Sequence, residues 1–136
     1  MRVKCQRIVG GQAVGDAIIT SQPINFLTMV NYDTGTINYQ NHELFGRSLQ
    51  GSVLVFPKAV GSSVGAYTIY SMKVANAAPV AMVCTEQADI ITSSGCAISN
   101  IPLVKIFDEF PQFSTKSELR LSVDATNEVI VIKKNK

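Results

Sequence analysis

The residues best able to do chemistry lie in a glycine- and serine-rich segment near the middle of the chain. Residues 57–65 read PKAVGSSVG and lie between an apolar strand-like run and a predicted helix. Ligands of α/β units gather at the carboxyl ends of strands, where the following helix offers unpaired N–H groups and about half a positive charge. A hydroxyl there loses its proton more easily than in water. We predict an anion-binding loop in which Ser62 is the reactive group and Gly61 and Ser63 contact the ligand.

A simpler interpretation is that Ser62 or Ser63 only caps the helix, since serine is a common cap. The two interpretations are compatible because both use the same N–H groups. Arg47 is the only arginine between Arg7 and Arg120. It is a candidate clamp for a carboxylate or phosphate, with a solvated surface charge as the alternative.

The cysteines and the histidine give no second reactive cluster. Cys5, Cys84 and Cys96 are widely spaced and form no CxxC or Cys/His pattern, so we expect buried free thiols and no metal ligands in this chain. His42 is the only histidine, and we interpret it as a polar loop or hydrogen-bonded core residue. No Ser–His–Asp order is present, so an enzyme built on this chain needs catalytic groups from a partner.

The elements that position these residues are mostly short strands. Runs rich in apolar or β-branched residues and bounded by turn formers predict strands at 17–20, 52–56, 80–83 and 129–132. The second and third runs are almost continuously apolar, which is typical of strands covered on both faces. Asp33 to Thr36 predicts a turn within an N-terminal third of β structure.

One helix is well supported, from about Ser63 to Asn76, because Ala66, Ile69 and Met72 recur at intervals of three. With its flanking strands it makes a βαβ unit. We also predict a short helix at 103–107 and a serine-rich loop at 92–96 that lines the same crevice. The fold class is therefore α/β, a mixed β and α domain with a barrel-like sheet around the βαβ unit.

Composition limits the function classes. The chain has 136 residues, which fits a single domain over 1–136. Charged residues are 16% of the chain and the net charge is +2, too weak to indicate nucleic-acid binding. The charge-free stretches are shorter than the ~20 residues of a membrane span. We expect a cytoplasmic protein with no membrane partner, and a solvated tail over 133–136.

Several short motifs occur in an order that resembles a known family. They are SQPINF (21–26), DTGTI (33–37), HELFG (42–46), GSVLVFP (51–57), GSSVG (61–65), AP (78–79), ADI (88–90) and IPLV (101–104). Together they resemble the swivel-domain small subunit of the aconitase X family. No single motif is specific, but the ordered set is.

The resemblance implies a swivelling β/β/α domain that pairs with a large catalytic subunit as a heterodimer, and that subunit carries an iron–sulfur cluster. It implies a hydro-lyase, active only with the large subunit, that binds a small anionic substrate. The reaction would remove water from mevalonate 5-phosphate to give trans-anhydromevalonate 5-phosphate, in the modified mevalonate pathway of isoprenoid biosynthesis.

The resemblance also implies roles for the two serines. The GSSVG segment resembles the Gly-Ser-Ser turn of aconitases, which makes Ser62 the proton acceptor and Ser63 its supporting neighbour. Aconitases follow the two serines with an arginine, whereas this chain has Val64. Contacts to the substrate anion must then come from elsewhere, such as Arg47 or the partner subunit.

Two other readings of the chain stay open. A relative of the same family dehydrates cis-3-hydroxyproline, so the substrate is not decided by the resemblance. The chain could also be a non-catalytic module that binds an anion or a partner. A phosphohistidine carrier is disfavoured because His42 lies in a different segment from the glycine-serine turn.

Overall fold

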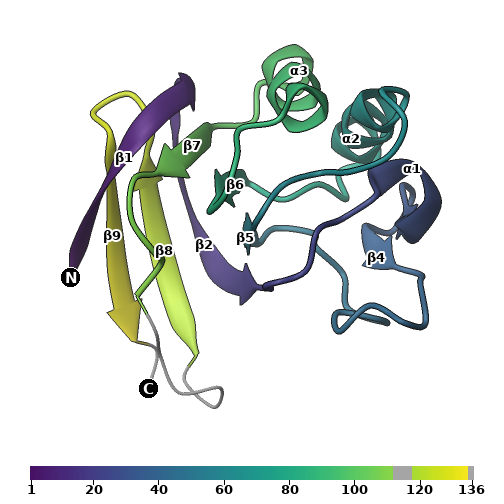
Figure 1. Cartoon of the computed structure of the whole chain (residues 1–136), viewed down its shortest axis with the longest axis horizontal. Helices are drawn as coiled ribbons and strands as arrows, with labels where there is room; N and C mark the ends of the chain where they lie inside the picture. Colours follow the sequence, from purple (N-terminus) through teal and green to yellow (C-terminus); the bar gives the residue numbers. More distant parts are fainter. Residues whose placement is uncertain (112–117, 135–136) are drawn as a thin grey trace.

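The computed structural model describes residues 1–111 and 118–134 and shows a closed barrel with helices on one side (Figure 1). The strands follow in the order β1 (Arg2–Val9), β7 (Leu103–Ile106), β6 (Ala81–Cys84), β5 (Val53–Phe56), β2 (Gln12–Ile19), β8 (Leu119–Asp124) and β9 (Val129–Lys134). Pairing of β9 with β1 closes the barrel. A small hairpin of β3 (Val30–Asn31) and β4 (Thr36–Ile37) lies outside it. The predicted α/β class with a barrel-like sheet is confirmed.

The helices follow from the parallel half of the barrel. Strands β2, β5, β6 and β7 run parallel to one another, and parallel strands need crossover connections. α1 (Phe26–Met29) lies in the connection from β2 to β5, α2 (Gly65–Val74) joins β5 to β6, and α3 (Ile90–Ser99) joins β6 to β7. The predicted βαβ unit is confirmed, and its helix begins and ends two residues inside the predicted bounds.

The core has two parts because the central strands are covered on both faces. Side chains alternate along β5, so Val53 and Val55 point into the barrel while Leu54 and Phe56 face the helices. β6 alternates in the same way, with Val83 inside the barrel. All residues of both strands are buried, as their continuous apolar sequences predict.

Residues 103–107 were predicted as a helix, and this prediction is wrong. Residues Leu103–Ile106 form β7, which pairs parallel to β6 and antiparallel to β1. Pro102 is compatible with the first turn of a helix, so local signals allowed that choice. The two neighbouring strands decide otherwise, because they supply hydrogen-bond partners on both sides of a four-residue run.

Residues 92–96 were predicted as a loop, and this prediction is also wrong because they lie within α3. Asp89 begins the helix, with its side chain accepting the Thr92 N–H. Ile91, Thr92 and Cys96 are buried on the face that packs against the rest of the molecule. The serine-rich composition of this segment is typical of a loop, so the buried face of the helix was not recognised in the sequence.

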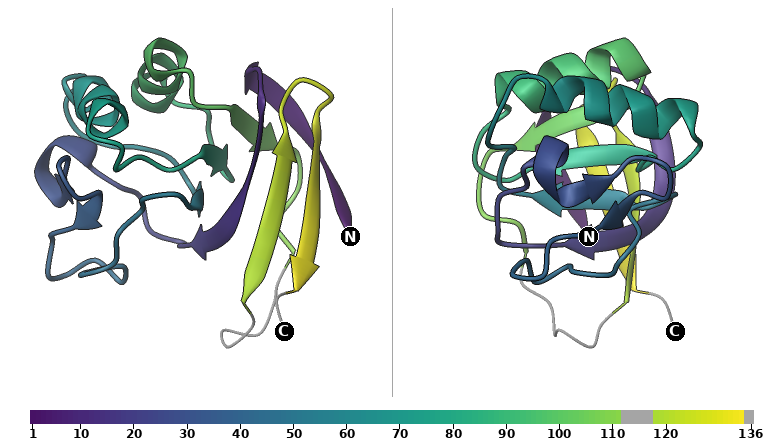
Figure 2. Two further views of the ribbon diagram at one scale, coloured as in Figure 1. Left: turned by 180° about the vertical axis from the view of Figure 1, so that it is seen from behind. Right: turned by 90° about the vertical axis from the view of Figure 1, so that its right-hand side faces the viewer.

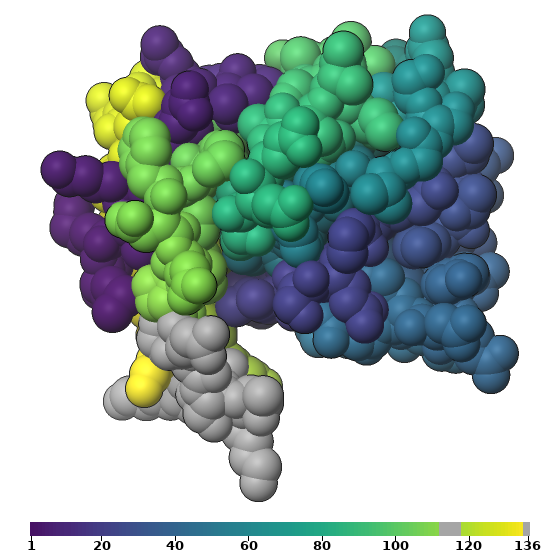
Figure 3. Space-filling view, in the orientation of Figure 1, coloured from purple at the N-terminus to yellow at the C-terminus, as the bar shows by residue number. Residues whose placement is uncertain are grey.

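The three helices gather at one end of the molecule, away from β8 and β9 (Figure 2). In the space-filling view, purple and yellow residues of the terminal strands occupy the opposite side from the blue and teal residues of α1 and α2 (Figure 3). No helix in the described ranges is long and apolar enough to cross a membrane. Lys133 and Lys134 are the exposed end of β9, whereas residues 135–136 of the predicted tail lie outside the described residues.

Candidate functional site

The segment 57–64, here called the serine loop, leaves the carboxyl end of β5 and leads into α2. The segments that follow β2 and β6 run beside it. The Thr20 N–H donates to the Val55 carbonyl and the Thr85 N–H donates to the Phe56 carbonyl, both at 2.9 Å. The serine loop therefore lies at the edge where the parallel strands end, which is where ligands of α/β folds collect.

On one flank, the serine loop is held by residues 24 and 25. The Ile24 N–H donates to the Lys58 carbonyl at 3.2 Å, and the Val60 N–H donates to the Ile24 carbonyl at 3.0 Å. Asn25 packs directly against Gly61, so that a Cβ added at this glycine would lie 2.2 Å from Asn25 Nδ2. The backbone of Gly61 has a φ of +95°, a conformation that favours glycine.

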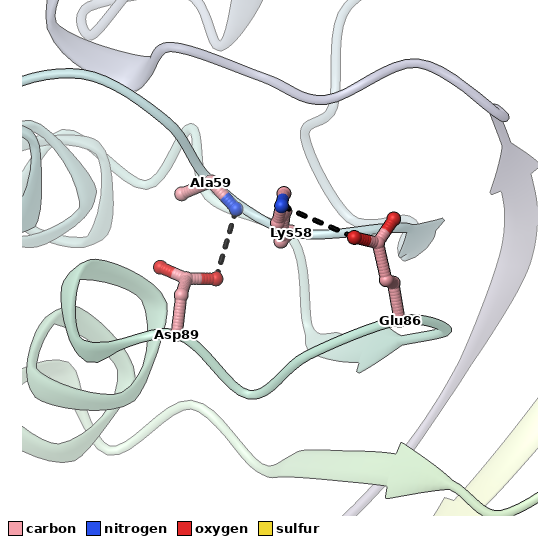
Figure 4. A network of polar contacts seen from close by, with 4 residues as sticks. All are labelled: Lys58, Ala59, Glu86 and Asp89. Atoms are coloured by element: carbon pink, nitrogen blue, oxygen red, sulfur yellow. Dashed lines mark hydrogen bonds and ion pairs between the residues drawn. The ribbon is translucent and has the colours of Figure 1, made fainter.

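On the other flank, the loop after β6 holds the same segment through two side chains (Figure 4). Asp89 Oδ1 accepts the Ala59 N–H at 2.8 Å, and Lys58 pairs with Glu86 at 3.1 Å. The ion pair is partly exposed, so its contribution to stability is small. The Asp89 contact is buried and fixes the direction of the backbone before Gly61.

Ser62 follows this fixed stretch and is exposed. Its Oγ accepts the Val64 N–H at 3.2 Å. Val64 is the N-cap residue of α2 and has no side-chain cap bond, so neither serine occupies the cap position itself. The hydroxyl thus lies just before the helix end that carries positive partial charge, as the sequence predicts.

The serine loop also offers backbone donors. Among residues 1–111 and 118–134, no protein atom accepts a hydrogen bond from the N–H groups of Gly61, Ser62 or Ser63. Three consecutive donors beside an exposed hydroxyl form a surface that can bind an anion and stabilise a negative oxygen. Within the same ranges, no histidine, carboxylate or lysine side chain is hydrogen-bonded to Ser62.

His42 is a buried, hydrogen-bonded residue, which agrees with the interpretation as a core residue. It is buried, its Nδ1 accepts the Leu44 N–H at 3.0 Å, and its Nε2 therefore carries the proton and donates to the Pro23 carbonyl at 3.2 Å. The next residue, Glu43, accepts hydrogen bonds from the Thr20 hydroxyl and from the Ser21 N–H. These contacts tie the 42–46 segment to the end of β2.

Arg47 lies in the connection between β4 and β5 and is exposed. Its N–H donates to the Leu44 carbonyl and its carbonyl accepts the Ile37 N–H, both at 2.9 Å. In the part of the chain that the structure describes, no hydrogen bond or ion pair joins it to the serine loop. Its role as a substrate ligand stays a prediction.

The cysteines are buried and free, which confirms the predicted thiols. Burial raises the pKa of Cys5 to about 11 and that of Cys84 to about 12, and it raises the pKa of Cys96 as well. Metal ligation needs the thiolate, so these sites disfavour it. No group of three or more His, Cys, Asp or Glu in the described ranges is placed to hold a metal. The cysteines therefore do not fit an iron–sulfur cluster.

Sequence reasoning missed two residues that shape the serine loop, Asn25 and Asp89. Both are helix N-caps, with side chains that accept the N–H of Thr28 and of Thr92 respectively. An Asn or Asp just before an apolar residue is a helix-start signal, so both caps were visible in the sequence. Their contacts with the serine loop were not, because these join distant segments.

Comparison with known proteins gives one family. Residues 2–132 match the aconitase X swivel domain. A phosphomevalonate dehydratase small subunit of Methanothrix thermoacetophila is 42% identical, over 97% of this chain and 95% of the relative. One of the same name from Thermococcus kodakarensis is 38% identical, over 92% of this chain and 91% of the relative.

Two solved structures have the same fold. The crystal structure of Thermococcus kodakaraensis aconitase X in its holo-form superposes with a TM-score of 0.87 at 35% identity, covering 98% of each chain. The solution NMR structure of a UPF0107 protein gives a TM-score of 0.86 at 31% identity, covering 98% of this chain and 99% of the other.

Proposed function

Because the chain belongs to the aconitase X swivel-domain family, we propose that it is the small subunit of phosphomevalonate dehydratase and that Ser62 is the proton acceptor. The relatives that carry this name match almost the whole chain. The observation that carries the proposal is the serine loop. It presents an exposed hydroxyl, beside N–H groups that have no acceptor among the described residues, at the edge where the parallel strands end.

The proposed reaction is the conversion of mevalonate 5-phosphate to trans-anhydromevalonate 5-phosphate. The deprotonated Ser62 oxygen takes a proton from the carbon next to the carboxylate. A carbon–carbon double bond forms as the bond to the β-hydroxyl breaks, and the proton and hydroxide lost make one water. The N–H groups of Gly61 and Ser63 stabilise the serine oxyanion or the substrate anion.

A larger partner subunit completes the site, because the described residues give Ser62 no second catalytic group. The word small in the names of the relatives agrees with such a partner. Large apolar side chains are exposed on the elements around the serine loop, with Tyr67 66% and Ile90 79% exposed. Docking at this face would exclude water from the Ser62 hydroxyl and strengthen its interactions.

The iron–sulfur cluster that the family implies would have its ligands on the larger subunit, since the thiols of this chain do not fit it. This chain then contributes the base, the anion-binding N–H groups and one wall of the site. A cytoplasmic location stays a prediction.

The test is a comparison of Ser62→Ala and Ser63→Ala in the reconstituted pair of subunits. Loss of a general base costs about 10²–10⁴-fold in rate, so we expect kcat of Ser62→Ala to fall by at least about 100-fold. Ser63→Ala keeps the backbone N–H of residue 63, so its kcat should fall far less than that of Ser62→Ala. Gel filtration checks that both variants still bind the larger subunit.

Near-normal turnover by Ser62→Ala in an intact complex would contradict the base assignment. The wild-type pair should be assayed on mevalonate 5-phosphate and on cis-3-hydroxyproline. Turnover of the second compound alone would move the proposal to the other substrate of the family, and turnover of neither would favour a non-catalytic module.

A further inference from the structure

Asp89 is a buried carboxylate that joins the serine loop to the start of α3. It is 8% exposed. Its Oδ1 accepts the Ala59 N–H at 2.8 Å and its Oδ2 accepts the Thr92 N–H at 2.9 Å. The Thr92 hydroxyl donates to both oxygens, at 2.9 and 3.1 Å. These contacts occupy both oxygens and fix the orientation of the carboxylate, which points at Ala59 in Figure 4.

We propose that Asp89 is a positioning residue whose bond to Ala59 sets the path of the serine loop and thereby the place of the Ser62 hydroxyl. The proposal rests on the proposed role of Ser62 as the base. Capping of α3 alone would need only one acceptor, which serine or asparagine supplies equally well. The carboxylate is needed for its second oxygen, which reaches across to the other loop.

Ala59 is the point at which the serine loop is held from both flanks. The Ala59 N–H donates a hydrogen bond to Asp89. On either side of it, the Lys58 carbonyl and the Val60 N–H are hydrogen-bonded to the backbone of Ile24. Ala59 is 5% exposed, so its N–H has little access to water if the carboxylate is removed. A buried N–H without a partner is costly, and the loop would shift to find another acceptor.

A shift of this kind would act on catalysis through geometry. Ser62 follows Ala59 closely in the sequence, and Asn25 packs against the intervening Gly61. A displacement of about 1 Å in a reacting group can cost about 100-fold in rate. Asp89 thus controls the position of Ser62 without contacting the substrate.

The experiment compares Asp89→Ser and Asp89→Asn with wild type in the reconstituted complex. Both variants keep an oxygen that caps α3, and both lose the acceptor for the Ala59 N–H. We expect kcat to fall about tenfold or more, with KM changed by less than about threefold, because proton transfer depends more steeply on geometry than binding does.

Thr92→Val is the matched control. It removes the hydroxyl contacts to the same carboxylate but leaves the bond from Asp89 to Ala59 in place. We expect its melting temperature to fall about as much as that of Asp89→Ser, with kcat close to wild type. A kcat that follows melting temperature across all three variants would overturn the proposal, since Asp89 would then be only a helix cap.

Hydrogen exchange of the complex, followed by mass spectrometry, supplies a readout besides activity. Asp89→Ser should speed exchange within the serine loop at Ala59 and Val60, whose N–H groups are hydrogen-bonded in the wild type, and leave residues 66–74 of α2 unchanged. Unchanged exchange in the serine loop would overturn the proposal. An active Ser62→Ala variant would instead refute the role of Ser62, and the catalytic part of this proposal with it. The exchange data would still show whether Asp89 holds the loop, so the two failures are distinguishable.

Discussion

At the scale of single residues, Gly61 is where the serine loop has least freedom to change. Its φ is +95°, and a Cβ would collide with the side-chain amide of Asn25. We predict that Gly61→Ala lowers the free energy of unfolding by about 2–3 kcal/mol, since backbone strain alone costs of order 1–3 kcal/mol. Urea unfolding of the chain measures this. In the reconstituted pair, turnover should fall as well because Ser62 follows directly.

Gly46→Ala is the control for that substitution. Gly46 has a similar φ of +84°, but nothing lies within 4 Å of the position that its Cβ would take. Gly46→Ala should lower the free energy of unfolding only by the cost of backbone strain, about 1 kcal/mol, and should leave turnover unchanged. Equal losses in both variants would show that the contact between Gly61 and Asn25 has no importance for the loop.

At the scale of elements, the placement of α3 depends on its close packing against α2. A Cβ at Gly95 would lie 2.6 Å from Ile69 Cδ1 and 3.3 Å from the Ala66 carbonyl oxygen. Alanine gains about 1 kcal/mol over glycine in a free helix, whereas overpacking costs about 1–3 kcal/mol. We therefore predict that Gly95→Ala lowers the free energy of unfolding by about 1 kcal/mol, measured by urea unfolding.

The double variant Gly95→Ala with Ile69→Val tests the cause. Valine lacks the Cδ1 atom that the new methyl would meet first. Part of the lost stability should therefore return, giving a favourable coupling energy between the two positions. Strictly additive losses would mean that the two helices can separate without strain.

At the scale of the whole molecule, burial of the three thiols in both parts of the core makes stability depend on alkaline pH. Their ordinary pKa is 9.0, and desolvation first, then nearby negative charge, raises it to about 11 for Cys5 and about 12 for Cys84. Above pH 9 the unfolded chain releases protons that the folded chain keeps. The contribution is complete below pH 9 and is lost as the pH rises through about 11–12.

We expect the free energy of unfolding to fall by up to about 1.4 kcal/mol per pH unit for each thiol between pH 9.5 and 10.5. Urea unfolding at several pH values measures the slope. In Cys5→Ala the free energy of unfolding should fall less per pH unit, by the contribution of one thiol. This difference separates the effect of the thiols from the ionisation of tyrosine and lysine. Identical slopes for wild type and Cys5→Ala would contradict the burial argument.

The sequence alone determined the features that depend on neighbouring residues. The continuous apolar runs of β5 and β6, the periodic face of α2 and the serine loop between them are local patterns. Burial of the thiols was expected because the cysteines form no metal-binding pattern and free cysteine is usually buried. The order of short motifs indicated the family, because many weak local matches add up along the chain.

Only the tertiary structure decided the features that depend on distant residues. The run at 103–106 is a strand because β1 and β6 flank it, and α3 is a helix whose buried face its serines concealed. Asp89 meets Ala59 across 30 residues of chain. Hydrogen bonds between segments far apart in sequence leave no periodic pattern, so the clamp that holds the serine loop appears only when the barrel closes and brings its strand ends together.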